Sequence, residues 1–166
     1  CVAKYLYDNG IVRKNVMTIE TLSGVKTLYI NTQNGLVHTV KVDMGKAELD
    51  PAQIPVRLPG PQVVDYPVTI ADRTWNITCV SMGNPHAVVF CDEVENLDLK
   101  DIGPLFEYNE LFPERVNTEF VKVIDQNTIK IRVWERGSGE TMACGTGACA
   151  AAVAAVLNGY CKKDTD

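Results

Sequence analysis

Residues 144–159 read C-G-T-G-A-C-A-A-A-V-A-A-V-L-N-G, and the apolar run within this stretch decides the fold. From residue 147 to residue 157 the run is apolar all round, which predicts a helix buried on every side. The segments before it alternate apolar and polar positions, as is typical of antiparallel strands. We therefore expect an α+β fold in which curved antiparallel strands surround one central helix.

The expected strands are separated by turn residues such as Asn34-Gly35, which is a strong hairpin signal. Residues 1–10 are expected to form a helix that ends at Asn9-Gly10. Residues 97–106 look weakly helical, with a break at Gly103-Pro104. The strands are expected at residues 16–22, 25–30, 36–44, 63–70, 75–82, 87–91, 118–124 and 128–135.

Composition favours a globular protein that binds a small molecule. The 166 residues are 46% apolar with a net charge of −5, and they hold no basic block beyond Lys162-Lys163. Nucleic acid and anionic membranes are therefore poor candidates for a partner. The longest apolar stretch is about half of the roughly 20 residues that a membrane span needs, and no signal peptide opens the chain. We expect a cytoplasmic protein.

The six cysteines are irregularly spaced in a domain too large to need disulfides, so free thiols are expected. No C-x-x-C motif occurs and the two histidines lie far apart, so no metal site is expected. Cys144 differs from the other cysteines because it lies just ahead of a helix, where a positive dipole end favours its thiolate. Gly145 and Gly147 would let an anion such as a carboxylate approach the backbone N–H groups.

Residues 1–10 align without gaps with residues 150–159, sharing an alanine and a final Asn-Gly. Two unrelated helices that end alike would explain this equally well. If the repeat is real, the counterpart of Cys144 would lie six residues before Cys1. The chain also opens on Cys1 rather than Met, within a helix already under way, so we expect residues to precede it.

Three motifs, at residues 82–86, 115–120 and 135–147, resemble those of one known family, the diaminopimelate epimerases. Residues 135–147 read E-R-G-S-G-E-T-M-A-C-G-T-G, similar to the signature around the family's second catalytic cysteine. M-G-N-P-H at 82–86 is similar to its central asparagine/histidine motif, and R-V-N-T-E-F at 115–120 to its substrate strand. Cys1 resembles the last residue of the family's C-G-N-G-x-R-C motif. The resemblance runs nearly end to end.

The resemblance implies two pseudo-symmetric domains, each a mainly antiparallel β-barrel around a central helix, with the active site between them. Residues 1–43 would be the remnant of the first domain and residues 44–166 most of the second. The proline-rich stretch at 51–67 and the turn at Met44-Gly45 favour a crossover there. Since the family continues with further strands, the second domain is expected to be truncated at its end.

The implied activity is cofactor-independent epimerisation of LL-2,6-diaminopimelate to meso-diaminopimelate, a step of lysine and peptidoglycan biosynthesis. Such chemistry needs two acid/base groups on opposite faces of the α-carbon. Thiols suit this role because their ordinary pKa, about 8.5, lies near neutrality. Cys144 would be one of the two, and the other is expected ahead of Cys1. We therefore expect this fragment to be inactive by itself.

The remaining roles follow from the resemblance. His86 and Glu135 would set the protonation of the thiols, while the N–H groups of Gly145 and Thr146 would hold the substrate carboxylate. The other expected substrate-binding residues are Asn84, Asn117, Glu135 and Arg136. Each also has an ordinary structural explanation: Glu135 and Arg136 as a solvated surface pair, His86 as a turn residue, and either asparagine as a marker of an edge strand.

Three alternatives remain open. The chain could be a related racemase, independent of pyridoxal phosphate, that acts on another amino acid, or a fragment that binds a carboxylate without catalysis. Residues 137–139 and 145–147 could instead form a phosphate loop, although no Gly-Lys-Ser/Thr follows and no parallel βαβ pattern surrounds them. The oligomeric state is open, a homodimer included.

Overall fold

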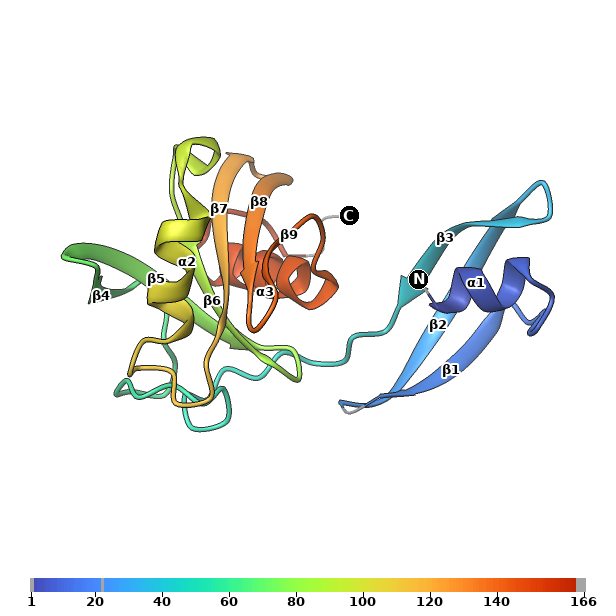
Figure 1. Cartoon of the computed structure of the whole chain (residues 1–166), viewed down its shortest axis with the longest axis horizontal. Helices are drawn as coiled ribbons and strands as arrows, with labels where there is room; N and C mark the ends of the chain where they lie inside the picture. The colour runs from blue at the N-terminus through green and yellow to red at the C-terminus, as the bar shows by residue number, and fades with distance from the viewer. Residues whose placement is uncertain (1, 22, 164–166) are drawn as a thin grey trace. The chain divides into compact units, whose positions relative to one another are not determined.

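The computed structural model describes residues 2–21 and 23–163 (Figure 1). Predictions that involve Cys1, or the end of the first strand at Leu22, lie outside the described residues. The chain divides into two compact units, Cys1–Gly45 and Lys46–Asp166. This division falls directly after Gly45, two residues beyond the boundary that the sequence predicted after residue 43.

The first unit is a helix on a three-stranded antiparallel sheet of order β1-β2-β3. At the β2–β3 hairpin, Asn34 and Gly35 both have positive φ, 54° and 77°, which confirms the predicted turn. Two hydrogen bonds of 2.8 Å join the helix to β3: the Lys4 ammonium donates to the Val37 carbonyl, and the Val37 N–H donates to the Asp8 carboxylate. The elements are α1 (Val2–Asp8), β1 (Val16–Thr21), β2 (Gly24–Gln33) and β3 (Leu36–Val42).

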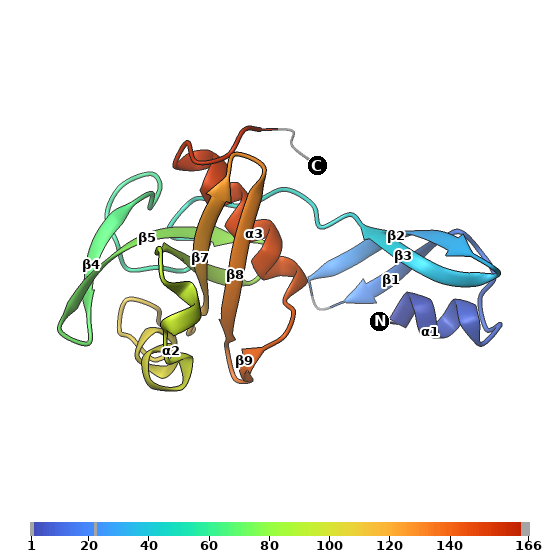
Figure 2. The ribbon, with the colours of Figure 1, turned by 90° about the horizontal axis from the view of Figure 1, so that it is seen from above.

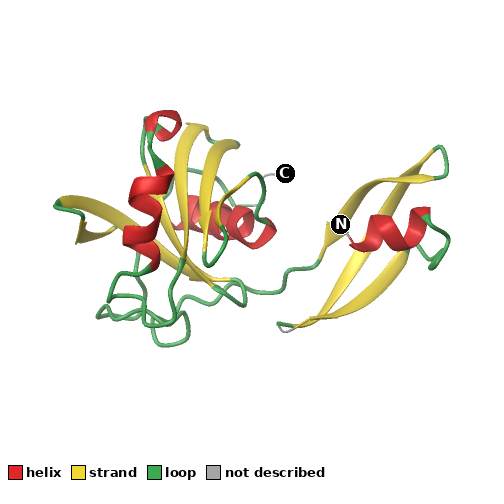
Figure 3. Ribbon diagram, in the orientation of Figure 1, coloured by secondary structure: helices red, strands yellow, loops and turns green. Residues whose placement is uncertain are grey.

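The second unit holds one six-stranded sheet of order β4-β5-β6-β7-β8-β9 and two α-helices (Figure 3). Every neighbouring pair is antiparallel except β6 and β7, which are parallel. The parallel pair and the short strand β9 are absent from the sequence-based expectation. The elements are β4 (Tyr66–Ile70), β5 (Arg73–Ser81), β6 (Pro85–Phe90), η1 (Val94–Asn96), α2 (Leu99–Glu107), β7 (Asn117–Asp125), β8 (Thr128–Glu135), β9 (Gly139–Thr141) and α3 (Gly145–Leu157).

The two α-helices cover opposite faces of the sheet at β7 and β8 (Figure 2). Successive residues of a strand point to opposite faces, and β7 follows this rule. Phe120 packs edge-to-face on Phe106 of α2, with ring centroids 5.4 Å apart. Its neighbour Glu119 instead lies against Gly147 of α3. The predicted α+β fold, with mainly antiparallel strands against one central helix, is confirmed.

The prediction that the alanine-rich helix is buried on every side is wrong for the described residues. One face of α3 packs against β5, β6, β7 and β8. The opposite face, which includes Ala148, Ala152 and Val156, is exposed. Alanine occupies both faces and no polar residue marks the exposed one, so only the contact with the sheet decides which face is covered. The buried residues of α3 are Gly147, Ala150, Ala151, Ala154 and Ala155.

The predicted break at Gly103-Pro104 is also wrong, because α2 continues through both residues to Glu107. Gly103 lies directly under the Trp134 ring: a Cβ atom added there would come within 2.2 Å of Trp134 Cδ2. The glycine is therefore a packing residue rather than a helix terminator. Proline is tolerated in the helix, at the cost of one backbone hydrogen bond.

Cys79 provides a pH-dependent prediction about stability. It is 1% exposed on β5, and burial raises the pKa of its thiol to about 12 from an ordinary 9.0. Between these values the unfolded chain releases the proton while the folded chain retains it, so stability falls as pH rises. We expect this thiol alone to lower the unfolding free energy by about 1 kcal/mol between pH 9 and pH 10.

Urea unfolding under reducing conditions at several pH values measures this effect, with Cys79→Ala as the matched variant. The alanine variant should be less stable at pH 8 because of its cavity, but its stability should fall less steeply above pH 9. Parallel pH profiles for the two proteins would exclude Cys79 as the cause.

Candidate active site

The parallel pairing of β6 and β7 brings together two motifs that are remote in sequence. In this register His86 lies opposite Asn117. The end of β8 carries Glu135, and Cys144 precedes α3 as its N-cap. The short strand β9 returns the chain from β8 to Cys144, pairing Glu135 with Gly139.

Cys144 is half-buried, and its sulfur accepts a hydrogen bond from the Gly147 N–H at 3.3 Å. The Thr146 hydroxyl lies 3.5 Å from the same sulfur. Burial nevertheless raises the pKa of the thiol, against the opposing effect of these two contacts, and the nearby Glu135 and Glu119 raise it further. The prediction of a favoured thiolate is therefore wrong for this structure, because desolvation outweighs the helix terminus.

Four side chains link Cys144 to the interior. His86 is fully buried, with Nδ1 2.8 Å from Glu119 Oε1 and Nε2 3.0 Å from Asn84 Oδ1. The Asn84 amide nitrogen donates to Thr146 Oγ1 at 3.3 Å, and Thr146 contacts the Cys144 sulfur. His86 is thus a core residue of β6 rather than a turn residue.

Asn117 is hydrogen-bonded to the backbones of Pro85 and Arg136. It is buried in an interior strand, so it does not mark a sheet edge. Its amide nitrogen donates to the Pro85 carbonyl at 2.8 Å, and its amide oxygen accepts from the Arg136 N–H at 2.9 Å. The Arg136 guanidinium donates to the Glu114 carbonyl at 2.8 Å, while Glu135 accepts a short hydrogen bond from the Thr141 hydroxyl.

The sequence analysis missed Glu119. This carboxyl group is completely buried on β7, where burial raises its pKa and the hydrogen bond with His86 opposes that rise. A Cβ atom at Gly147 would come within 2.5 Å of Glu119 Oε1. Because glycine has no side chain, the carboxyl group can pack against the start of α3. An acidic residue between Thr118 and Phe120, within a predicted strand, was an available signal.

Glu107, the second missed residue, lies 2% exposed at the end of α2. Its carboxylate accepts from the Gly137 N–H at 2.9 Å and from Trp134 Nε1 at 2.8 Å. Glu107 thereby fixes the turn that follows Glu135 and Arg136. Gly137 and Gly139 serve that same turn with φ values of 78° and 80°. No local sequence signal marks Glu107, because its partners come from β8.

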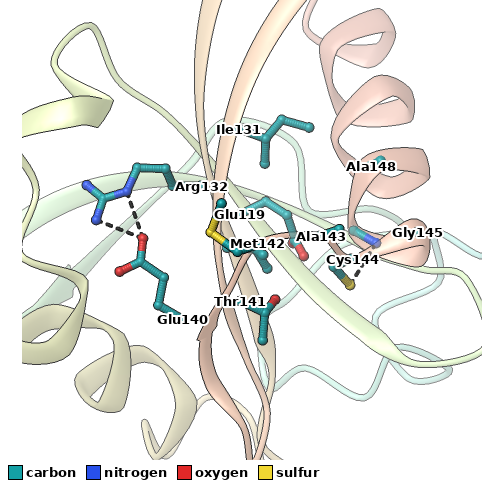
Figure 4. A pocket seen from close by; sticks show the side chains of 12 residues that line it. Glu119, Ile131, Arg132, Glu140, Thr141, Met142, Ala143, Cys144, Gly145 and Ala148 are labelled. Carbon is teal, nitrogen blue, oxygen red and sulfur yellow. Dashed lines mark hydrogen bonds and ion pairs between the residues drawn. The ribbon is translucent and has the colours of Figure 1, made fainter.

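A cavity of about 520 Å³ lies between β8, β9 and the start of α3 (Figure 4). Cys144 and Gly145 line it, as do Glu119 and the ion pair of Arg132 with Glu140, whose charged atoms are 2.8 Å apart. None of the predicted substrate-binding residues besides Gly145 lines this cavity. We therefore do not assign it as the substrate site.

The five cysteines that the structure describes are free thiols. Among residues 2–21 and 23–163, no group of three or more His, Cys, Asp or Glu side chains is placed to hold a metal ion. Within the same ranges, no helix has the length and apolar character that crossing a membrane requires.

Comparisons with known proteins agree with the motifs. Residues 78–166 match the family model described as diaminopimelate epimerase. The diaminopimelate epimerase of Methanococcus maripaludis is 52% identical over 160 residues, which cover 96% of this chain and 58% of the relative. That of Acetivibrio thermocellus is 52% identical over 163 residues, covering 98% and 58%. The chain thus spans just under three fifths of the length of these curated relatives.

Two solved structures share the fold at low sequence identity. A probable proline racemase from Agrobacterium radiobacter K84 aligns with a TM-score of 0.73 at 18% identity, covering 96% of this chain and 51% of that one. A hydroxyproline epimerase from Agrobacterium vitis aligns with a TM-score of 0.67 at 15% identity, covering 99% and 52%.

Proposed function

The chain belongs to the diaminopimelate epimerase family, and from this premise we propose that its protein interconverts LL-2,6-diaminopimelate and meso-diaminopimelate without a cofactor. The observation that carries the proposal is the linkage of Cys144, through Thr146 and Asn84, to the buried His86. A thiol held in this way is suited to removing or returning a proton at the substrate α-carbon.

In one direction the Cys144 thiolate accepts the α-proton and becomes a thiol, while a second acid on the opposite face returns a proton to the carbon. In the reverse direction Cys144 donates. We do not assign the second group among the described residues. Because burial raises the pKa of Cys144, the thiol form is the more populated one near neutral pH, which suits the donating direction.

We propose that the substrate carboxylate binds at the start of α3. The first N–H groups of a helix have no acceptor within it. In α3 the Gly147 N–H donates to the cysteine sulfur, and we propose that the N–H groups of Gly145 and Thr146 donate to the carboxylate. The partial positive charge of the helix terminus favours a bound anion and the negative charge that develops at the α-carbon.

The remaining predicted residues have supporting roles in this proposal. Arg136 supplies a cationic guanidinium, and Asn117 fixes the backbone that carries it. The amide nitrogen of Asn117 has a second proton, beyond the one donated to Pro85, that could reach the substrate. Asn84 and Glu135 would contact the substrate ammonium group, and the charge of Glu135 raises the pKa of the Cys144 thiol.

We further propose a cytoplasmic location, and a homodimer remains a prediction.

Proton exchange measured by ¹H NMR in D₂O tests the function. The protein that contains this chain should replace the α-hydrogen of both LL- and meso-diaminopimelate with deuterium and interconvert the two isomers. Exchange of proline or hydroxyproline but not diaminopimelate would favour a related racemase, the second candidate. Binding of diaminopimelate without exchange would favour a site that only holds the carboxylate.

A further inference from the structure

We propose that Glu119 is a positioning residue which keeps its own proton and so directs a line of hydrogen bonds toward the Cys144 sulfur. The part of this proposal that makes Cys144 a base rests on the proposed function. The direction of the hydrogen bonds does not. The line passes through His86, Asn84 and Thr146.

Burial is the first argument for a protonated Glu119. Both Glu119 and His86 are 0% exposed. Glu119 Oε1 contacts His86 Nδ1 at 2.8 Å, but Oε2 has no hydrogen-bond partner among the described residues. An ionised carboxylate in a dry site needs donors on both oxygens, whereas a protonated carboxyl group can satisfy its O–H with one acceptor. His86 Nδ1 is that acceptor.

The acidic neighbours of Glu119 favour the same state, whereas the contact with His86 lowers the pKa of Glu119 and opposes it. His86 approaches it from β6, Glu135 from β8, and Cys144 from the start of α3. Glu135 is acidic, and Cys144 becomes negative whenever it acts as a base, so both disfavour a second negative charge at Glu119. Arg132 lines the same cavity, but its guanidinium is paired with Glu140 at 2.8 Å.

For a neutral imidazole, the location of this one proton decides the direction of the whole line. If Glu119 donates to His86 Nδ1, the imidazole proton lies on Nε2 and is donated to Asn84 Oδ1. The Asn84 amide nitrogen then donates to Thr146 Oγ1, and the Thr146 hydroxyl is left to donate to the Cys144 sulfur. The thiolate then accepts from both Thr146 and the Gly147 N–H.

The opposite direction requires an ionised Glu119 and a proton on His86 Nδ1. The Asn84 amide must then turn over so that its nitrogen donates to His86 Nε2 and its oxygen accepts from Thr146. In that arrangement the cysteine thiol is the donor to Thr146, which stabilises the thiol instead of the thiolate. The tautomer of His86 therefore distinguishes the two directions.

Long-range ¹H–¹⁵N NMR of the 166-residue chain measures this tautomer. The chain contains two histidines, and the exposed His38 on β3 provides a reference spectrum. We expect His86 to show a protonated Nε2 and an unprotonated Nδ1 at pH 7. A proton on Nδ1, or on both nitrogens, would overturn the proposal without any need for a variant.

Two substitutions then test the effect on Cys144, followed by iodoacetamide alkylation and peptide mass spectrometry. Glu119→Gln keeps a donor for His86 Nδ1, so the pH profile of alkylation at Cys144 should match that of the parent. Glu119→Leu removes the donor, and we expect alkylation about tenfold slower at pH 8, with the profile displaced to higher pH. An unchanged profile in the leucine variant, or equal losses in both, would contradict the proposal.

Neither measurement uses a substrate. A wrong tautomer with normal diaminopimelate exchange would reject the role of Glu119 alone. The expected tautomer without exchange would reject the proposed function and leave the role of Glu119 in place.

Discussion

Replacing Cys144 with serine should lower the rate of α-proton exchange by roughly 10²- to 10⁴-fold, the usual contribution of a general acid/base group. A serine hydroxyl is the same shape but does not ionise near neutral pH. The fold should survive, because serine is among the preferred N-cap residues and Cys144 is the N-cap of α3. The loss would therefore reflect chemistry rather than unfolding.

The measurement is ¹H NMR of diaminopimelate in D₂O, with thermal unfolding as the check on structure. Cys149→Ser is the matched control, since Cys149 lies in the same helix, is also half-buried and has no assigned role. We expect this control to retain exchange within a few-fold of the parent rate. Exchange that persists in Cys144→Ser would rule out the cysteine as a base.

The location of Cys144 could be predicted from sequence because every cue for it is local. Gly145 and Gly147 follow the thiol and lead into an apolar run, so a helix start is the natural interpretation. The sign of its pKa shift could not be predicted in this way. That shift depends on desolvation and on the charges of Glu119 and Glu135, which belong to strands distant in sequence.

The hydrogen-bond partners of His86 could not be predicted from the sequence for a related reason. The parallel register of β6 and β7 places His86 opposite Asn117 and lets Glu119 reach the imidazole. A connection that includes η1 and α2 separates these strands, and no hairpin turn fixes their register. The alternation within each strand predicts that it is a strand, but not which strand lies beside it.

Replacing Gly103 with alanine should lower the unfolding free energy by about 3 kcal/mol, the upper part of the usual range for overpacking a core. The new methyl group would lie 2.2 Å from Trp134 Cδ2 and 2.5 Å from Cγ, so the ring or the helix must shift. The ring is held by its own hydrogen bond to Glu107 at 2.8 Å. Alanine's better helix propensity, worth up to about 1 kcal/mol, offsets only part of this cost.

Gly145→Ala is the matched control, because it makes the same change in the first turn of α3, where a Cβ atom meets nothing within 4 Å. Urea unfolding should find this variant as stable as the parent or slightly more so. The Gly103 change should also disturb the site, since Trp134 precedes Glu135 and shares the Glu107 carboxylate with the Gly137 N–H. Equal stability of the two variants would contradict this packing role. It would mean that Gly103 only weakens the helix, as the sequence alone suggested, and that the Trp134 ring does not require a glycine beneath it.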